Sequence, residues 1–303
     1  MPEYRAHFDF DIRFANGGGL TGEAFRLDVP SAAISERDLE LLLIEHLGLT
    51  LVGSVTIRDL QVVEEPHRGS RGVDTGAQPS ARRIVDLSHP IRAGLVTYPG
   101  LPAPTITPHL TREDSRERYA PGTEFAMDIL TMVGNTGTYL DSPFHRYADG
   151  ADLAGLDLAT LVGLRAEVFH LEDVWSATDR GIRTAVLADR DVRGAAVLLH
   201  TGWDRWFGAP EYGVGAPFLT GEAAQWLIDA GAVLVGIDSV NIDDTESGGE
   251  RPAHSLLLAA GVHVVEHLTR LGELPPRGAR FTAAPPAVEG FGTFPVRAFA
   301  EIG

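Results

Sequence analysis

The chain has 303 residues, of which 44% are hydrophobic and 22% are charged, proportions that exclude a chain disordered throughout and predict a sizeable core. This length exceeds what one ordinary domain needs. The 42 acidic residues outnumber the 25 basic residues and give a formal net charge of −17, so we expect no nucleic-acid partner, because binding to phosphates needs a basic face.

The sequence shows no feature of export or of membrane insertion. The first residues, MPEYRAHFDFDIRF, lack the basic region and the apolar run of a secretory signal. No apolar stretch approaches the roughly 18 residues of a membrane span. Cysteine is absent, which excludes disulfides and thiolate chemistry. We therefore expect a cytoplasmic protein that does not bind membranes.

Residues 1–66 predict a small α+β unit. Within it, residues 8–14 and 23–29 alternate strictly between apolar and polar side chains, as half-buried strands do. A helix with a leucine stripe is expected to begin at a capping box that starts at Ser35. Residues 51–65 again resemble a strand, so one helix covers one face of a small sheet. No group of titratable residues points to chemistry here, and we interpret this unit as structural.

Residues 67–83 contain Gly, Ser, Pro and Arg but almost no apolar residue, which predicts a linker. Residues 84–303 predict a larger α/β domain. Its apolar runs at 195–199 and 233–237 are typical of strands buried on both faces. The pattern of residues 220–230 predicts a helix before the second of these strands.

The first candidate site is the segment NTGTYLDSPFH, residues 135–145. If the segment is extended as far as Asp141, every second side chain from Asn135 onward, including Tyr139, points to one side. The proline that follows turns the chain, so His145 could return toward Asp141, and an Asp beside a His fixes the imidazole tautomer and raises its basicity. A polar strand end with a surface histidine is the alternative.

Three further places carry polar groups that need an explanation. Glu266 lies in an apolar strand with His254 twelve residues before it, and a buried Glu is costly unless it is paired or binds a metal. Asp238 follows a buried strand, where α/β proteins commonly bind ligands, although turn formation is the alternative. For Asp243 and Asp244 a turn is the favoured interpretation. Trp203 could line a pocket or simply pack. Motifs of serine hydrolases, P-loop proteins, dinucleotide enzymes and HExxH metalloproteases are absent from the sequence.

Taken in order, these segments resemble the cyclase family, which includes bacterial kynurenine formamidase and isatin hydrolase. The resemblance covers about residues 84–300 and is carried by Asp86–Ile91, Tyr98–Gly100, residues 135–145, Thr201–Trp203, Gly236–Asp238, Pro252–His254, Glu266 and Phe294–Ala298. It implies an α/β fold with a mixed β-sheet and flanking helices, hydrolysis of an amide or lactone, and a homo-oligomer. An apolar edge strand at residues 8–14 would favour the same assembly.

The sequence differs from the family motif at two of the metal-ligand positions. The family motif H-x-G-T-H-x-D-x-P-x-H implies two metal-binding histidines, and here these positions hold Asn135 and Tyr139. Neutral Asn and Tyr are poor ligands for a divalent transition metal. We therefore favour a site without a metal cofactor. The alternative is one Zn or Mn ion held by Asp141, His254 and Glu266.

Three functions follow as hypotheses. The first is a hydrolase that opens an amide, lactone or imide in a small metabolite, with His145 as general base and Tyr139 or Asn135 as donors to the developing oxyanion. The second is a metal-independent cyclase or dehydratase of a biosynthetic intermediate. The third is a non-catalytic protein that binds a small molecule, although a decayed site has no reason to keep four costly polar groups, namely Asp141, His145, His254 and Glu266.

Overall fold

The computed structural model describes residues 4–64 and 82–303. The chain divides into two compact units, Met1–Gln78 and Pro79–Gly303. The predicted linker at 67–83 lies almost entirely outside the described residues, and its last residue, Arg83, begins the first strand of the second unit.

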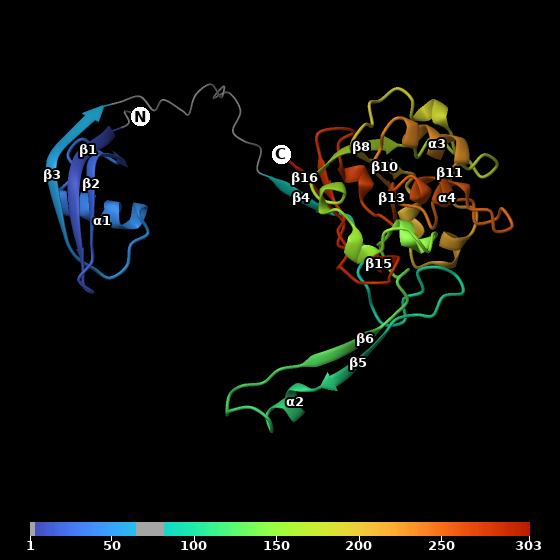
Figure 1. The fold of residues 1–303 in the computed structure, drawn as a ribbon, viewed down its shortest axis with the longest axis horizontal. Helices are drawn as coiled ribbons and strands as arrows, with labels where there is room; N and C mark the ends of the chain where they lie inside the picture. The colour runs from blue at the N-terminus through green and yellow to red at the C-terminus, as the bar shows by residue number, and fades with distance from the viewer. Residues whose placement is uncertain (1–3, 65–81) are drawn as a thin grey trace. The chain divides into compact units, whose positions relative to one another are not determined.

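The first unit has the predicted strands and helix. It consists of β1 (Tyr4–Phe14), β2 (Gly19–Val29), α1 (Glu36–His46) and β3 (Val52–Glu64), as Figure 1 shows. The hydroxyl of Ser35 accepts a hydrogen bond from the backbone N–H of Asp38 at 3.1 Å, which is the capping contact expected from the sequence.

The prediction that residues 8–14 form an exposed sheet edge is wrong. The sheet order is β2-β1-β3, so β1 is hydrogen-bonded to an antiparallel neighbour on both sides. Its apolar side chains, among them Phe8 and Ile12, are buried against Leu39 and Leu43 of α1. The apolar face is therefore covered within the unit, and β1 offers no free edge to a partner.

The second unit is built round a mixed sheet of nine strands, which confirms the predicted fold class. The order is β15-β7-β13-β12-β10-β8-β14-β16-β4, with β8, β10, β12 and β13 parallel and the outer strands antiparallel. The strands are β4 (Arg83–Asp86), β7 (Tyr139–Asp141), β8 (Leu164–His170), β10 (Ala195–His200), β12 (Leu234–Ile237), β13 (His263–Glu266), β14 (Arg280–Thr282), β15 (Thr293–Pro295) and β16 (Phe299–Ile302).

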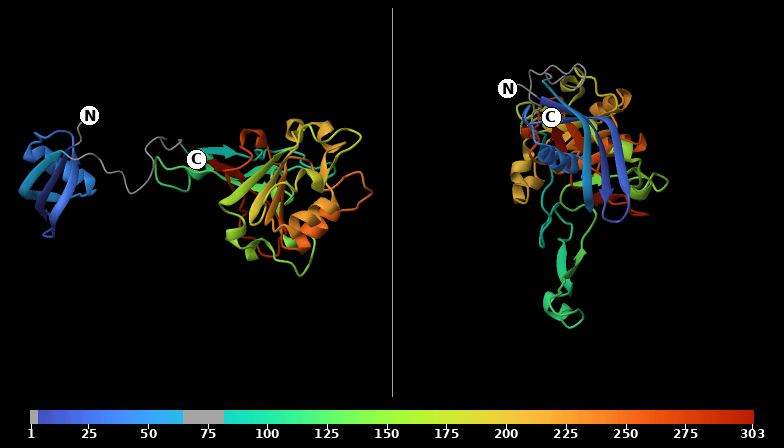
Figure 2. Two further views of the ribbon diagram at one scale, coloured as in Figure 1. Left: turned by 90° about the horizontal axis from the view of Figure 1, so that it is seen from above. Right: turned by 90° about the vertical axis from the view of Figure 1, so that its left-hand side faces the viewer.

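Helices α3 (Gly221–Asp229) and α4 (Pro252–Ala259) lie side by side on one face of the parallel strands (Figures 1 and 2). Their buried residues form one apolar cluster with that face of the sheet. A second apolar cluster covers the opposite face. Because both faces are covered, the parallel strands are almost wholly buried, as their uninterrupted apolar sequences predict.

Two further strand pairs stand apart from this sheet. The pair β9 (Gly181–Ile182) and β11 (Phe218–Leu219) is parallel, and the hairpin of β5 (Thr105–Leu110) and β6 (Met127–Thr131) carries the short helix α2 (Arg112–Ser115) between its strands. Figure 1 shows this hairpin extending away from the rest of the second unit, and it exposes the apolar side chains of Ile106, Phe125, Met127, Ile129 and Leu130. No helix among the described residues is long and apolar enough to cross a membrane.

Candidate active site

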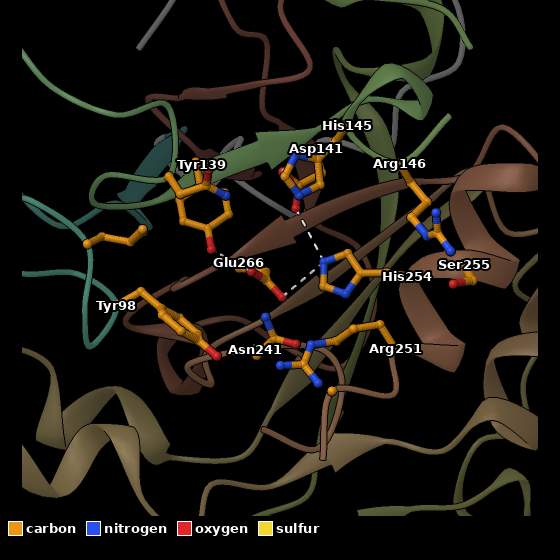
Figure 3. Close-up of a pocket in the computed structure, with 13 residues that line it drawn as sticks. Tyr98, Tyr139, Asp141, His145, Arg146, Asn241, Arg251, His254, Ser255 and Glu266 are labelled. Atoms are coloured by element: carbon orange, nitrogen blue, oxygen red, sulfur yellow. Dashed lines mark hydrogen bonds and ion pairs between the residues drawn. The ribbon is translucent and has the colours of Figure 1, made fainter. Parts of the chain in front are cut away.

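A cavity of about 490 Å³ opens beside β7 and β13 (Figure 3). This volume suits a small molecule. Six of the eight residues singled out as candidates from the sequence line it, and the lining is Tyr98, Leu101, Asn135, Tyr139, Asp141, His145, Arg146, Asn241, Gly249, Arg251, His254, Ser255 and Glu266.

The pairing of β7 with β13 brings the first acidic groups together. The two strands are antiparallel, with Glu266 opposite Tyr139. Tyr139 and Asp141 are two residues apart on the strand, so their side chains point to the same side, as predicted. The buried hydroxyl of Tyr139 donates to Glu266 Oε2 at 2.6 Å. Tyr139, which replaces a histidine of the family motif, therefore already binds one oxygen of Glu266.

His254 approaches both carboxylates from α4. Its Nε2 atom lies 3.4 Å from Asp141 Oδ2 and 3.5 Å from Glu266 Oε1, the contacts drawn as dashed lines in Figure 3. Asp141 Oδ2 is buried and has no hydrogen-bond partner in the described chain. Three polar atoms thus converge on one point, which is a costly arrangement without a positive charge between them.

Asp243 fixes the orientation of His254. Its carboxylate accepts hydrogen bonds from the backbone N–H groups of Ala253 and His254 at 2.6 and 3.0 Å, which begin α4. It also lies 2.7 Å from Nδ1 of His254, so it accepts the proton of that ring nitrogen. This contact leaves Nε2 to face the two other carboxylates. A carboxylate behind an imidazole in this way is typical of metal-binding histidines.

The three carboxylates also determine the protonation of His254. Burial alone would lower the pKa of this imidazole, but the nearby carboxylates of Glu266, Asp141 and Asp243 outweigh it and raise the pKa to about 10. Burial raises the pKa of Glu266 to about 7, partly offset by His254 and by hydrogen bonds from Tyr139 and Ile242. Burial would raise the pKa of Asp141, but His254, His145 and the hydroxyl of Thr293 outweigh it and hold that pKa below its usual value.

His145 is linked to Asp141 through the hydroxyl of Thr293. Thr293 donates its proton to Asp141 Oδ1 and lies 2.7 Å from Nδ1 of His145. Because a hydroxyl has one proton, the Thr293 oxygen must accept from a protonated Nδ1 of His145. A neutral His145 therefore keeps a lone pair on Nε2. Its side chain is 37% exposed, so this nitrogen can meet a substrate or a water molecule.

The donor set of this cluster fits a divalent metal ion. Asp141, His254 and Glu266 each offer one ligand atom, and all three atoms lie within 4.8 Å of one another. Imidazole and carboxylate are ligands that Zn²⁺ and Mn²⁺ accept. The unpartnered Oδ2 of Asp141 and the carboxylate behind His254 both favour such an ion. The geometry thus supports the alternative metal triad more than the two lost histidines suggest.

The structure does not bring two of the predicted residues to the cavity. Asp238 accepts hydrogen bonds from the backbone of Thr201 and Gly202 and from the Thr201 hydroxyl, so it holds the loop that follows β10. Burial raises the pKa of Asp238 to about 7, although these hydrogen bonds oppose the shift. Trp203 donates from its ring N–H to the carbonyl of Tyr212 and packs in an apolar cluster. Asp238 thus stabilises the loop after β10, and Trp203 packs against its apolar neighbours.

The extended conformation expected for residues 135–141 holds only from Tyr139 onward. Gly137 has φ +67°, a left-handed conformation, and a side chain there would meet Ile91 at 3.1 Å. This glycine therefore allows the loop to lie close to Ile91 and to the backbone of His89. Asn135 still reaches the cavity because the loop, rather than the strand, carries it there.

Sequence reasoning missed a chain of hydrogen bonds behind Tyr139. The Tyr212 hydroxyl lies 2.8 Å from Nδ1 of His267, and Nε2 of His267 lies 3.2 Å from the Tyr139 hydroxyl. Because Tyr139 donates to Glu266, it must accept from His267. Strand alternation places His267 on the opposite face from Glu266, but its φ of +57° ends that alternation. We find no signal in the sequence for this turn.

Other missed residues are the positioning acid Asp243, which the sequence suggested only as a turn residue, and two arginines that line the cavity, Arg146 and Arg251. His200, which directly precedes the segment Thr201–Trp203, does not line the cavity. Its Nδ1 atom lies 2.9 Å from Nδ1 of His170, and these two histidines form with Glu172 a separate group of possible metal ligands.

Comparison with known proteins identifies the relatives of this chain. The family model described as "Putative cyclase" matches residues 85–244. The kynurenine formamidase of Geobacillus thermodenitrificans is 30% identical over 216 residues, which cover 71% of this chain and 95% of the relative. The kynurenine formamidase of Paracidovorax citrulli is 29% identical over 228 residues, which cover 72% of this chain and 95% of the relative.

Solved structures agree with these relatives on the fold. An isatin hydrolase bound to the product analogue thioisatinate is 24% identical with a TM-score of 0.62, and the match covers 73% of this chain and 92% of that one. A structure described as a potential metal-dependent hydrolase with cyclase activity is 28% identical with a TM-score of 0.59, and the match covers 74% and 99%. In each comparison, the match spans nearly the whole of the other protein.

The raised pKa of His254 predicts a histidine that stays protonated at neutral pH in metal-free protein. NMR titration of the ring should show the change of charge near pH 10 rather than near its ordinary value. Because the pKa is raised on folding, the charged ring stabilises the fold fully below about pH 6.5, and this stabilisation is lost as the pH rises through about 10. Asp243→Asn should lower the pKa. Titration of the wild-type ring near pH 6.5 would contradict this account.

Proposed function

This chain belongs to the cyclase family, and we propose that it is a hydrolase that opens an amide, lactone or imide bond in a small cyclic or cyclisable metabolite. The observation that carries the proposal is the pairing, in one cavity, of an accessible His145 Nε2 with the buried cluster of Asp141, His254 and Glu266. The relatives named kynurenine formamidase and isatin hydrolase support hydrolysis as the reaction class.

In this proposal, His145 acts as the general base. Its Nε2 accepts a proton from water while the water oxygen forms a bond to the substrate carbonyl carbon. Thr293 accepts the Nδ1 proton and is itself held by Asp141, so the ring keeps the tautomer that the reaction needs. When the carbonyl re-forms and the bond to the leaving nitrogen or oxygen breaks, the proton on Nε2 passes to the leaving atom. Water is thereby added across one bond.

We propose a role for Tyr139 other than that of an oxyanion donor. Its hydroxyl proton is directed at Glu266, which supports a role in positioning that carboxylate. Asn135 keeps its place as a candidate donor because its amide lines the cavity. Asn241 joins it: its oxygen accepts from the backbone of Asp243, and this leaves its NH₂ group for a ligand.

The residues that would hold a divalent ion are Asp141, His254 and Glu266. When bound, a Zn²⁺ or Mn²⁺ ion would lower the pKa of a water molecule and polarise a carbonyl. The second candidate function, a metal-independent cyclase or dehydratase, is favoured by one observation. A protonated His254 between the two carboxylates satisfies the cluster without an ion. Product analysis distinguishes ring opening from ring closure, and turnover of any kind contradicts a role in binding alone.

Replacing His145 tests the general base. His145→Ala should reduce kcat by about a hundredfold or more toward a panel of aryl formamides, lactones and imides, because general-base catalysis contributes that much. The change should be read from initial rates at saturating substrate. His170→Ala is the matched control, since His170 lies outside the cavity lining, and it should retain wild-type rates. A His145→Ala protein with wild-type kcat would remove His145 from the mechanism.

Metal content tests the triad. After dialysis against Zn²⁺ or Mn²⁺ and removal of excess metal, elemental analysis should find an ion that is lost in His254→Ala. The ion should persist in His170→Ala, because His170 belongs to the other group of possible ligands. If His254→Ala retains the ion, or if wild-type protein takes up none, the cluster holds a proton and the metal-independent reaction becomes the better account.

We also propose a homo-oligomer that acts on a small-molecule substrate in the cytoplasm, with no nucleic-acid or membrane partner. The apolar side chains exposed on β5 and β6 favour association, because large exposed apolar patches commonly mark contacts between proteins. Light scattering at micromolar concentration should give a mass of two or more chains. The mass of a single chain would contradict this prediction.

A further inference from the structure

Two arginine side chains line the candidate active-site cavity without an acidic partner. Arg146 and Arg251 both contribute to its wall, and Figure 3 shows both beside His254 and Ser255. Neither forms an ion pair with a carboxylate anywhere in the described chain. Many other arginines of this acidic protein do, Arg180 and Arg297 among them. Cations that line a cavity and lack an acidic protein partner are suited to an anionic ligand.

Arg251 is anchored by a single nitrogen. Its Nη1 atom donates to the carbonyl of Glu250 at 2.7 Å, to the carbonyl of Asp244 at 3.2 Å and to the hydroxyl of Ser247 at 3.5 Å. Nε and Nη2 make no hydrogen bond to any residue that the structure describes. This free edge of the guanidinium presents two parallel N–H groups, the geometry that binds both oxygens of a carboxylate.

Arg146 is positioned by the ring of its neighbour, Tyr147. Its guanidinium lies over the ring of Tyr147, 5.3 Å from the ring centre. The Tyr147 hydroxyl in turn donates to the carbonyl of Ser255 in α4 at 2.9 Å, which ties this residue pair to the helix that follows Arg251. Both positive charges are thus fixed near the beginning of α4, the helix that also carries His254.

The negative charge of the cavity explains why these arginines favour binding of an anion. Asp141 and Glu266 line the cavity as buried carboxylates, and His254 lies between them and a third buried carboxylate, Asp243, behind the ring. An anionic substrate would be repelled from this centre if nothing offset those charges. Two guanidinium groups on the same cavity can hold an anionic group at one end of a ligand while its neutral carbonyl reaches His145.

We propose that Arg251, assisted by Arg146, is a carboxylate-binding subsite, so that the substrate is a small molecule bearing a carboxylate in addition to the bond that is cleaved. The second half of this statement rests on the proposed hydrolase function, whereas the subsite rests on the arginines alone. Arg251 contributes the bidentate contact, and Arg146 adds a second positive charge.

Binding of simple probes tests the subsite without any reaction. Calorimetry or ligand-observed NMR should show that wild-type protein binds benzoate at least tenfold more tightly than benzamide. Arg251→Gln should remove that preference, Arg251→Lys should retain part of it, and benzamide binding should stay unchanged, which also shows that the cavity is folded. Arg280→Gln is the matched control, because Arg280 is an exposed arginine outside the cavity lining.

Several results would overturn the proposal. They are undetectable binding of benzoate, equal affinity for benzoate and benzamide, and an Arg251→Gln protein that binds benzoate as the wild type does. Tighter binding of inorganic phosphate than of benzoate would assign the subsite to a phosphate group instead. Each of these outcomes is independent of whether the protein hydrolyses anything.

A rate comparison separates this inference from the proposed function. N-formylanthranilate, which carries a carboxylate, should have a higher kcat/KM than its methyl ester, and the difference should disappear in Arg251→Gln. If neither compound is cleaved while Arg251 still governs benzoate binding, the hydrolase proposal fails and the subsite remains. If both are cleaved with equal kcat/KM, the hydrolase proposal gains support and the subsite has no role in recognition.

Discussion

The burial of three carboxylates around one imidazole is the constraint on which the second unit depends. Asp141 comes from β7, Glu266 from β13 and Asp243 from the loop after β12, and His254 of α4 contacts all three. Unpaired, such charges would cost several kcal/mol each in a protein interior. The position of α4 on the sheet is therefore tied to the cluster, because moving the helix would remove the one cation that the carboxylates share.

The replacement of two motif histidines changes what this cluster can bind. Tyr139 donates its proton to one oxygen of Glu266, and the backbone of Ile242 donates to the other. Glu266 is thus more fully hydrogen-bonded than Asp141, whose Oδ2 has no hydrogen-bond partner in the described part of the chain. An ion in this site would have fewer strong ligands than in a site with two more imidazoles, and more open positions for water or substrate.

Periodic patterns in the sequence predicted the elements well, but they gave no indication of the contacts that Asp243 and His267 make. Alternation located β1 and β2, apolar runs located β10 and β12, and the Glu in an apolar strand predicted a buried partner, which proved to include His254. Such patterns depend on burial, which the local sequence records. The role of Asp243 depends on where α4 starts relative to a loop ten residues earlier, and that of His267 on a positive φ. Both features depend on the tertiary structure, which the periodicity of the local sequence does not reveal.

The proton on His254 and a divalent ion would occupy the same space, because both are attracted by the same three atoms. Uptake of an ion must therefore release that proton, so ion occupancy responds to acidity as well as to metal concentration. A tenfold fall in proton concentration and a tenfold rise in free ion would then act on the site in equivalent ways. If the cluster binds an ion, its occupancy would therefore depend on the ratio of free metal ions to protons around the protein.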